Sequence, residues 1–277
     1  MPAFGPLVAP DWLRQHSDDP DLVVVDFRWY LDGRSGREAY LSGHIPGAVF
    51  LDLDDVTGPH PPGGRHPLPS RERFQAAARA AGIGKATTVV AYDDASGSNA
   101  GRLWWLLRWF GHRRAAVLDG GIQAWGEPLE THEVAKPEGD FEAQEPDPGA
   151  VVDFEQVAGR PAETVLIDAR APERYRGEEE PVDPRAGHIP GAVNVFWKSN
   201  VGEDGRFRSA AELRRLYQAA GVRNGAEVVV YCGSGVSSVH DLIALELAGF
   251  KGVKLYAGSW SEWLEHGEAA VGTGPEP

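Results

Sequence analysis

Short runs of β-branched and other apolar residues recur along the chain, each bounded by polar or small residues. Four runs predict buried parallel strands, because a strand covered on both faces is apolar throughout: 23–25, 89–91, 165–167 and 228–230. Spaced apolar positions that end at a glycine predict helices over 71–81 and 210–220, and two further helical patterns cover 102–110 and 238–250. Alternating strands and helices predict an α/β fold with a mostly parallel sheet, whose ligands bind beyond the carboxyl ends of the strands.

This pattern occurs twice. The six residues Gly-His-Ile-Pro-Gly-Ala stand at 43–48 and again at 187–192, between strand and helix patterns that match in the same order. We therefore expect two copies of one domain, at 1–130 and 150–277. The residues between them, 131–149, are rich in Pro, Glu, Asp and Gly and lack periodic apolar positions, which predicts a surface linker.

Composition argues against several classes of protein. The 277 residues carry a net charge of −14, which disfavours nucleic acid or an anionic membrane surface as the main partner. No stretch of about 18 apolar residues predicts a membrane span. Residues 1–6 lack a basic segment followed by an apolar run, so we expect a cytoplasmic protein without a secretory signal. The single cysteine, Cys232, excludes an intrachain disulfide, a CxxC redox pair and a multi-cysteine zinc site.

Cys232 stands at the end of a predicted strand. The small-residue turn Gly233-Ser234-Gly235-Val236-Ser237 follows it, and a helix is predicted to begin at Ser238. Such a turn can aim successive backbone N–H groups at one point, and the helix N-terminus adds a positive potential there. Because this environment stabilises a thiolate, we predict a reactive cysteine rather than a buried structural one.

Two other kinds of loop have a similar sequence shape. A dinucleotide-binding turn needs an acidic residue at the end of the next strand, and the run 253–256 ends without one. A cysteine phosphatase loop needs an arginine at the position of Ser238, so phosphatase activity is disfavoured.

The first copy has Asp93 at the place of Cys232, and a carboxylate cannot accept sulfur as a thiolate does. We therefore expect the second copy to be catalytic and the first to be inactive.

Three motifs resemble the tandem-domain rhodanese family: the repeated Gly-His-Ile-Pro-Gly-Ala, the Asp-x-Arg that follows the first predicted strand of each copy, and the late sequence Gly-Ser-Trp-Ser-Glu-Trp at 258–263. These are the thiosulfate and 3-mercaptopyruvate sulfurtransferases, and the resemblance covers nearly the whole chain. It implies two rhodanese-like α/β domains and a Cys232 persulfide that forms and is discharged in a ping-pong cycle, with no metal or organic cofactor. It also implies a small anionic sulfur donor and a cyanide, thiol or thioredoxin-like acceptor.

The loop also bears on the donor. The sequence Cys-Gly-Ser-Gly-Val at 232–236 is similar to the loop of mercaptopyruvate-type members, whereas Ser237-Ser238 departs from it. Members of that type use a relay that resembles the one in serine proteases. The resemblance places the relay at Ser234, His66 and Asp54, with His60 as a nearby competitor of His66. The chemistry needs a proton carrier, because sulfur leaving mercaptopyruvate generates an enolate that must be protonated.

An anionic donor also requires cations. The resemblance assigns Arg174 to the substrate anion, although a helix arginine paired with a glutamate is the alternative. The second arginine of the family falls at Asp183, and Arg185, two residues further on, either takes that role or leaves it unfilled. The remaining donor-binding candidates are the loop residues Gly233, Gly235, Val236, Ser237 and Ser238.

Other polar residues are expected to be structural. The glutamates at 178–180 predict a solvated loop, and His44 and His188 occur in both copies, so a structural role in the turn is favoured over catalysis. Two alternative functions remain open. One is a persulfide carrier or sensor that serves a protein partner with little small-molecule turnover. The other is a reductase that acts on oxyanions through Cys232 and external thiols.

Overall fold

The computed structural model describes residues 5–61 and 63–277. This part of the chain forms two compact units. One unit comprises the residues up to Gly58 together with 69–146 and 203–206, and the other comprises 59–68, 147–202 and 207–277. Each unit contains one of the two expected copies and also a short segment from the other copy's stretch of sequence. The domain limits of 1–130 and 150–277 stay a prediction.

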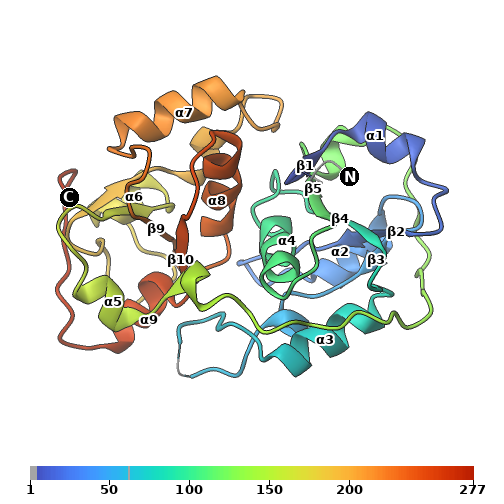
Figure 1. The fold of residues 1–277 in the computed structure, drawn as a ribbon, viewed down its shortest axis with the longest axis horizontal. Coiled ribbons are helices and arrows are strands. Elements are labelled where there is room, and N and C mark those ends of the chain that lie inside the picture. The colour runs from blue at the N-terminus through green and yellow to red at the C-terminus, as the bar shows by residue number, and fades with distance from the viewer. Residues whose placement is uncertain (1–4, 62) are drawn as a thin grey trace. The chain divides into compact units, whose positions relative to one another are not determined.

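Within the described residues, the first unit has a parallel sheet of five strands in the order β1-β5-β4-β2-β3 (Figure 1). The strands are β1 Leu7–Val8, β2 Leu22–Asp26, β3 Val49–Phe50, β4 Thr88–Tyr92 and β5 Ala115–Leu118. The helices are α1 Pro10–Gln15, α2 Gly36–Ser42, α3 Arg71–Ala80 and α4 Ala100–Trp109, with the 3₁₀ helices η1 Asp54–Val56 and η2 Ile122–Ala124. Strands β2 and β4 are buried along their whole length, as their apolar runs predict.

The second unit repeats this arrangement, with a parallel sheet of five strands in the order β6-β10-β9-β7-β8 among the residues that the structure describes. The strands are β6 Val151–Val152, β7 Val165–Asp168, β8 Ala192–Asn194, β9 Val228–Tyr231 and β10 Lys254–Tyr256. The helices are α5 Phe154–Ala158, α6 Pro172–Arg176, α7 Ala210–Ala219, α8 Ser238–Leu247 and α9 Ser259–Glu265, with the 3₁₀ helices η3 Pro148–Ala150 and η4 Trp197–Asn200. The predicted fold class, two α/β domains with parallel sheets flanked by helices, is confirmed.

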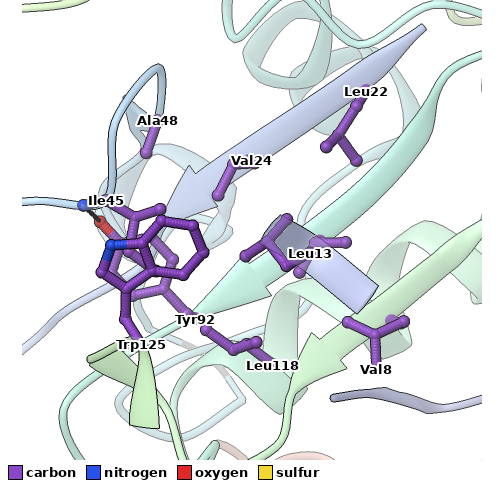
Figure 2. Close-up of a cluster of buried hydrophobic side chains, with 11 residues drawn as sticks. Val8, Leu13, Leu22, Val24, Ile45, Ala48, Tyr92, Leu118 and Trp125 are labelled. Carbon is purple, nitrogen blue, oxygen red and sulfur yellow. Dashed lines mark hydrogen bonds between the residues drawn. The ribbon is translucent and has the colours of Figure 1, made fainter. Parts of the chain in front are cut away.

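The repeated hexapeptide contributes to the core of each unit. In the first unit, Ile45 packs with Tyr92 and Trp125, and the Ile45 N–H donates to the Tyr92 hydroxyl at 3.1 Å (Figure 2). In the second unit the Ile189 N–H donates to the Tyr231 hydroxyl at the same distance. Each tyrosine ends a central strand, so this contact fixes the hexapeptide itself to the sheet.

The histidine of each hexapeptide contacts a backbone carbonyl through its ring. The Nδ1 atom of His44 lies 2.9 Å from the Tyr40 carbonyl oxygen, and that of His188 lies 2.8 Å from the Tyr175 carbonyl oxygen. Both rings are buried and stacked on the same tyrosines. The expectation of a structural role therefore agrees with the contacts in both copies.

The segment 131–149 runs along the first unit beside α3 before it enters the second (Figure 1). The Gly139 N–H donates to the Arg79 carbonyl at 2.9 Å, the Gln144 N–H donates to the Phe110 carbonyl at 2.9 Å, and Phe141 is buried. Backbone hydrogen bonds thus attach the predicted linker to the unit that precedes it. None of the helices in the described ranges is long and apolar enough to cross a membrane.

Candidate active site

Cys232 follows β9 and lies at the carboxyl end of a central strand of the second sheet. Its side chain is buried, with 2% of the residue exposed. The start of α9 is hydrogen-bonded to the loop. The Trp260 N–H donates to the Cys232 carbonyl at 3.0 Å, and the Ser261 N–H donates to the Gly233 carbonyl at 2.9 Å. The Cys232 N–H donates in turn to the Ser259 hydroxyl at 3.1 Å. The backbone of the cysteine is therefore fixed on both sides.

Gly235 allows the loop to pass close to the neighbouring strand end. It adopts a φ of 76°, and a Cβ atom built on it would lie 2.2 Å from the Ala257 carbonyl oxygen. Both the left-handed backbone and the lack of space require glycine here. The loop then turns so that Val236, Ser237 and Ser238 enter α8 next to the cysteine.

The loop surrounds the Cys232 thiol with hydrogen-bond donors. Burial by itself raises the pKa of the thiol, but the Ser237 hydroxyl and the N–H groups of Ser234 and Ser238 stabilise the thiolate. Together these donors hold the pKa of Cys232 below its ordinary value. Hydrogen-bond donors that favour the thiolate are typical of a nucleophilic cysteine rather than of a core residue.

The first unit contains an equivalent loop, here called the cradle of N–H groups, which surrounds Asp93 instead of a cysteine. The Asp93 carboxylate is fully buried and accepts hydrogen bonds from the N–H groups of Ala95, Gly97, Asn99 and Ala100, at 2.7–2.9 Å. A loop at the end of a central strand, leading into a helix, thus directs N–H groups at one acidic side chain in both copies. In the first copy the chain's own carboxylate fills the place, so the loop is built to bind negative charge.

His66 contacts the loop after Cys232 from a segment that lies more than half the chain before that loop in the sequence. Its Nδ1 lies 2.7 Å from the Ser234 hydroxyl, and both side chains are buried. His60, the alternative candidate, has about half of its side chain exposed, and its Nδ1 lies 3.9 Å from a Glu265 carboxylate oxygen. The structure therefore brings Ser234 together with His66.

Asp54, the third residue of the predicted relay, belongs to the first unit. It begins η1 and is exposed, and its carbonyl accepts from the Arg73 guanidinium at 2.7 Å. Partial burial and then the neighbouring Asp52 and Asp55 raise the pKa of its carboxyl group. Its part in a relay stays a prediction.

Arg174 lies on α6 and is paired with acidic side chains. Its guanidinium donates to the Glu180 carboxylate at 2.6 and 3.1 Å and to Asp183 at 3.0 Å. The glutamates at 178–180 were expected to be solvated. That expectation is wrong for Glu180, whose side chain is only 4% exposed because it pairs with both Arg174 and Arg170.

Arg185 and Asp183 differ in their surroundings. Asp183 is buried and contacts the guanidinium groups of both Arg65 and Arg174. Arg185 is exposed, and its carbonyl accepts from the Trp260 indole N–H at 3.1 Å.

Sequence reasoning missed Arg65. A Cβ atom on Gly233 would lie 2.9 Å from the Arg65 Nη2 atom and 3.7 Å from both Nη atoms of Arg174. Two cations therefore face the residue directly after Cys232. The signal that could have identified Arg65 is its position directly before His66, a residue already chosen for the relay.

Comparison with known proteins places these features in context. The family described as "Rhodanese-like domain" matches residues 9–128 and 153–266. A probable 3-mercaptopyruvate sulfurtransferase of Pseudomonas aeruginosa is 43% identical and aligned over 97% of this chain and 98% of its own length. A putative thiosulfate sulfurtransferase, SseB of Mycobacterium tuberculosis, is 42% identical over 92% of each chain. The crystal structure of SseA from Escherichia coli, described with the mechanism of 3-mercaptopyruvate sulfotransferases, has a TM-score of 0.83 and 37% identity, and covers 93% of this chain and all of its own.

Proposed function

Since the chain belongs to the rhodanese family and is a sulfurtransferase, we propose that Cys232 takes sulfur from a small donor and passes it to a thiol or cyanide. The donor is 3-mercaptopyruvate or thiosulfate, with 3-mercaptopyruvate favoured. The observation that carries this proposal is the group of donors around the buried Cys232 thiol, which lower its pKa. We place the activity in the second copy alone, because Asp93 fills the corresponding loop of the first copy.

The first half-reaction forms a persulfide. The Cys232 thiolate attacks the sulfur of 3-mercaptopyruvate, an S–S bond forms, and the C–S bond breaks with its electron pair going to carbon. The resulting enolate of pyruvate takes up the proton that the donor thiol carried, so pyruvate leaves and the outer sulfur stays as an anion. The amides and hydroxyls of the loop then stabilise that charge as they stabilise the thiolate.

In the second half-reaction the acceptor attacks the outer sulfur and the S–S bond breaks. A thiolate acceptor leaves as a persulfide, cyanide leaves as thiocyanate, and the Cys232 thiolate is restored. Thioredoxin-like proteins offer such a thiol. The two half-reactions make a ping-pong cycle, and neither requires a metal or an organic cofactor.

We assign proton transfer in the first half-reaction to the Ser234–His66 pair. The 2.7 Å contact between the Ser234 hydroxyl and His66 Nδ1 provides a path for a proton at the loop that holds the donor. Thiosulfate needs no such path, because its leaving group is sulfite, which departs without taking up a proton.

Three variants test this function. Cys232→Ser is expected to abolish sulfur transfer from both donors while circular dichroism shows an unchanged fold. Ser234→Ala and His66→Ala are expected to lower kcat/KM for 3-mercaptopyruvate by about 100-fold or more and to affect thiosulfate far less. Transfer by Cys232→Ser would contradict the persulfide, and equal losses on both donors would remove the proton path.

A protein-bound persulfide carrier is the alternative. Such a carrier would show a single turnover with 3-mercaptopyruvate and little steady-state activity with small acceptors. The 2% exposure of Cys232 favours small molecules over a docking protein as the direct reactants. Steady-state rates with a small thiol acceptor distinguish the two functions.

A further inference from the structure

We infer that Arg65 is the second cation of the donor site and binds the carboxylate of 3-mercaptopyruvate together with Arg174. The inference rests on the proposed function. It assigns a donor-binding role to a residue of the segment 59–68, which belongs to the compact unit of Cys232 although it lies far from that cysteine in sequence.

The first observation is the position of the guanidinium. Arg65 Nη2 is the nearest atom to the place that a side chain on Gly233 would take, at 2.9 Å, and the two Nη atoms of Arg174 follow at 3.7 Å. Gly233 is the residue after Cys232, and the two arginines approach it from different segments. A small anion held at Gly233 would therefore meet two guanidinium groups.

The second observation is how firmly the segment is held. The N–H groups of Gly63 and Gly64 donate to the Glu265 carboxylate at 3.4 and 3.2 Å, and the Arg65 N–H donates to the Ser261 hydroxyl at 3.1 Å. Gly64 has a φ of 79°, and a Cβ there would lie 2.5 Å from the Gly258 carbonyl oxygen. The backbone that carries Arg65 is thus fixed to α9, the helix that also supports the loop of Cys232.

The third observation is an unmet hydrogen-bond donor. Arg65 Nη1 pairs with Asp183, whereas Arg65 Nε is buried without a hydrogen-bond partner in the part of the chain described. A buried donor in this state is costly, and a ligand oxygen can satisfy it. The side chain is 27% exposed, so the group is both oriented by Asp183 and accessible to a small molecule.

Charge explains why this chain needs Arg65. The position at which the family resemblance places a second arginine holds Asp183, whose carboxylate contacts both Arg65 and Arg174. Without Arg65, Arg174 would face the two carboxylates of Glu180 and Asp183 and would carry no surplus positive charge for a donor. Arg65 offsets Asp183, so that the four charges sum to zero instead of −1 and no longer repel an anionic donor.

The test compares steady-state kinetics with 3-mercaptopyruvate in the full-length protein. Arg65→Gln is expected to raise KM about 10- to 100-fold with kcat changed by less than about threefold, as the loss of a charge-assisted contact to a ground-state carboxylate predicts. Arg65→Lys, which keeps the charge but not the fork, is expected to recover part of the loss. Arg176→Gln is the matched control, because Arg176 lies on α6 with a similar exposure and pairs with the surface glutamates Glu173 and Glu178.

The outcomes separate this inference from the function on which it rests. A wild-type protein without transfer from either donor would overturn the proposed function. A wild-type protein that transfers sulfur, with an unchanged KM in Arg65→Gln, would overturn the inference alone, as would a rise in KM on Arg185→Gln instead. The rate of Cys232 alkylation serves as a second readout, since a variant with a damaged loop would change that rate and an intact one would not.

Discussion

The fit of Gly235 against Ala257 makes a sharp prediction about stability. Replacing Gly235 with alanine places a Cβ 2.2 Å from a backbone carbonyl oxygen, on a residue with a φ of 76°. The left-handed conformation costs about 1–2 kcal/mol for a residue with a side chain. Forcing the backbone apart costs about 1–3 kcal/mol more, because the obstacle is main chain and cannot rotate away. We expect Gly235→Ala to lower the free energy of unfolding by about 2–5 kcal/mol.

Gly225→Ala provides the matched control. Gly225 has a φ of 79°, and nothing lies within 4 Å of the Cβ that a substitution would add. This variant therefore incurs the conformational cost of about 1–2 kcal/mol without the collision. The difference between the two variants isolates the contact with Ala257, and we expect it to be about 1–3 kcal/mol.

Urea unfolding followed by circular dichroism measures both variants, and sulfur transfer is assayed at a temperature at which both are folded. The displaced loop of Gly235→Ala moves the Ser234 and Ser238 N–H groups relative to the Cys232 sulfur. A displacement near 1 Å is expected to reduce kcat/KM by about 100-fold. Gly225→Ala should retain activity. Equal stabilities in the two variants would refute the steric argument, and wild-type activity in Gly235→Ala would refute the claim that the loop geometry controls the cysteine.

Two further predictions concern the anions in the two loops. Ser237→Ala removes the largest contribution that lowers the pKa of Cys232, so the thiolate should form only at higher pH, and the midpoint of the pH dependence of Cys232 alkylation should move upward; an unmoved midpoint would exclude this role for the hydroxyl. Asp93→Ala leaves four N–H groups without their acceptor, three of them buried and that of Ala95 partly buried. Each buried one costs about 1–3 kcal/mol before the relief of a buried charge is subtracted, and we expect a net loss of at least about 2 kcal/mol in the free energy of unfolding. The neighbouring Asp94→Ala gives up one hydrogen bond, from Tyr30, and should cost less; a larger loss for Asp94→Ala would contradict the comparison.

The sheets and the position of Cys232 were predictable because local patterns determine them. The fully apolar runs in β2, β4, β7 and β9 can only be central strands, and the repeat identifies equivalent positions in the two copies without a structure. The small residues after Cys232 likewise indicate a loop that can converge on an anion. These features depend on neighbours in sequence.

Features that depend on contacts between distant segments were not predictable in the same way. The segment 59–68 lies in the first half of the sequence but belongs to the unit of the second sheet, so the one sign that Arg65 lies near Gly233 was its position directly before His66. Glu180 was misjudged for a similar reason. Its two glutamate neighbours are exposed, and only the positions of Arg170 and Arg174 explain why it alone is buried.

The two cradles show how one backbone arrangement serves both stability and catalysis. In the first copy four N–H groups bind the oxygens of Asp93, which is part of the chain and never leaves, so the loop is always satisfied. In the second copy the donors converge on a single sulfur. Under the proposed function, the charge on that sulfur would move outward to a second sulfur when the persulfide forms and return when the acceptor takes it. Under the proposed function, the replacement of a carboxylate by a thiol at one position makes this loop reactive, and the guanidinium groups of Arg65 and Arg174 near Gly233 would contact the incoming donor.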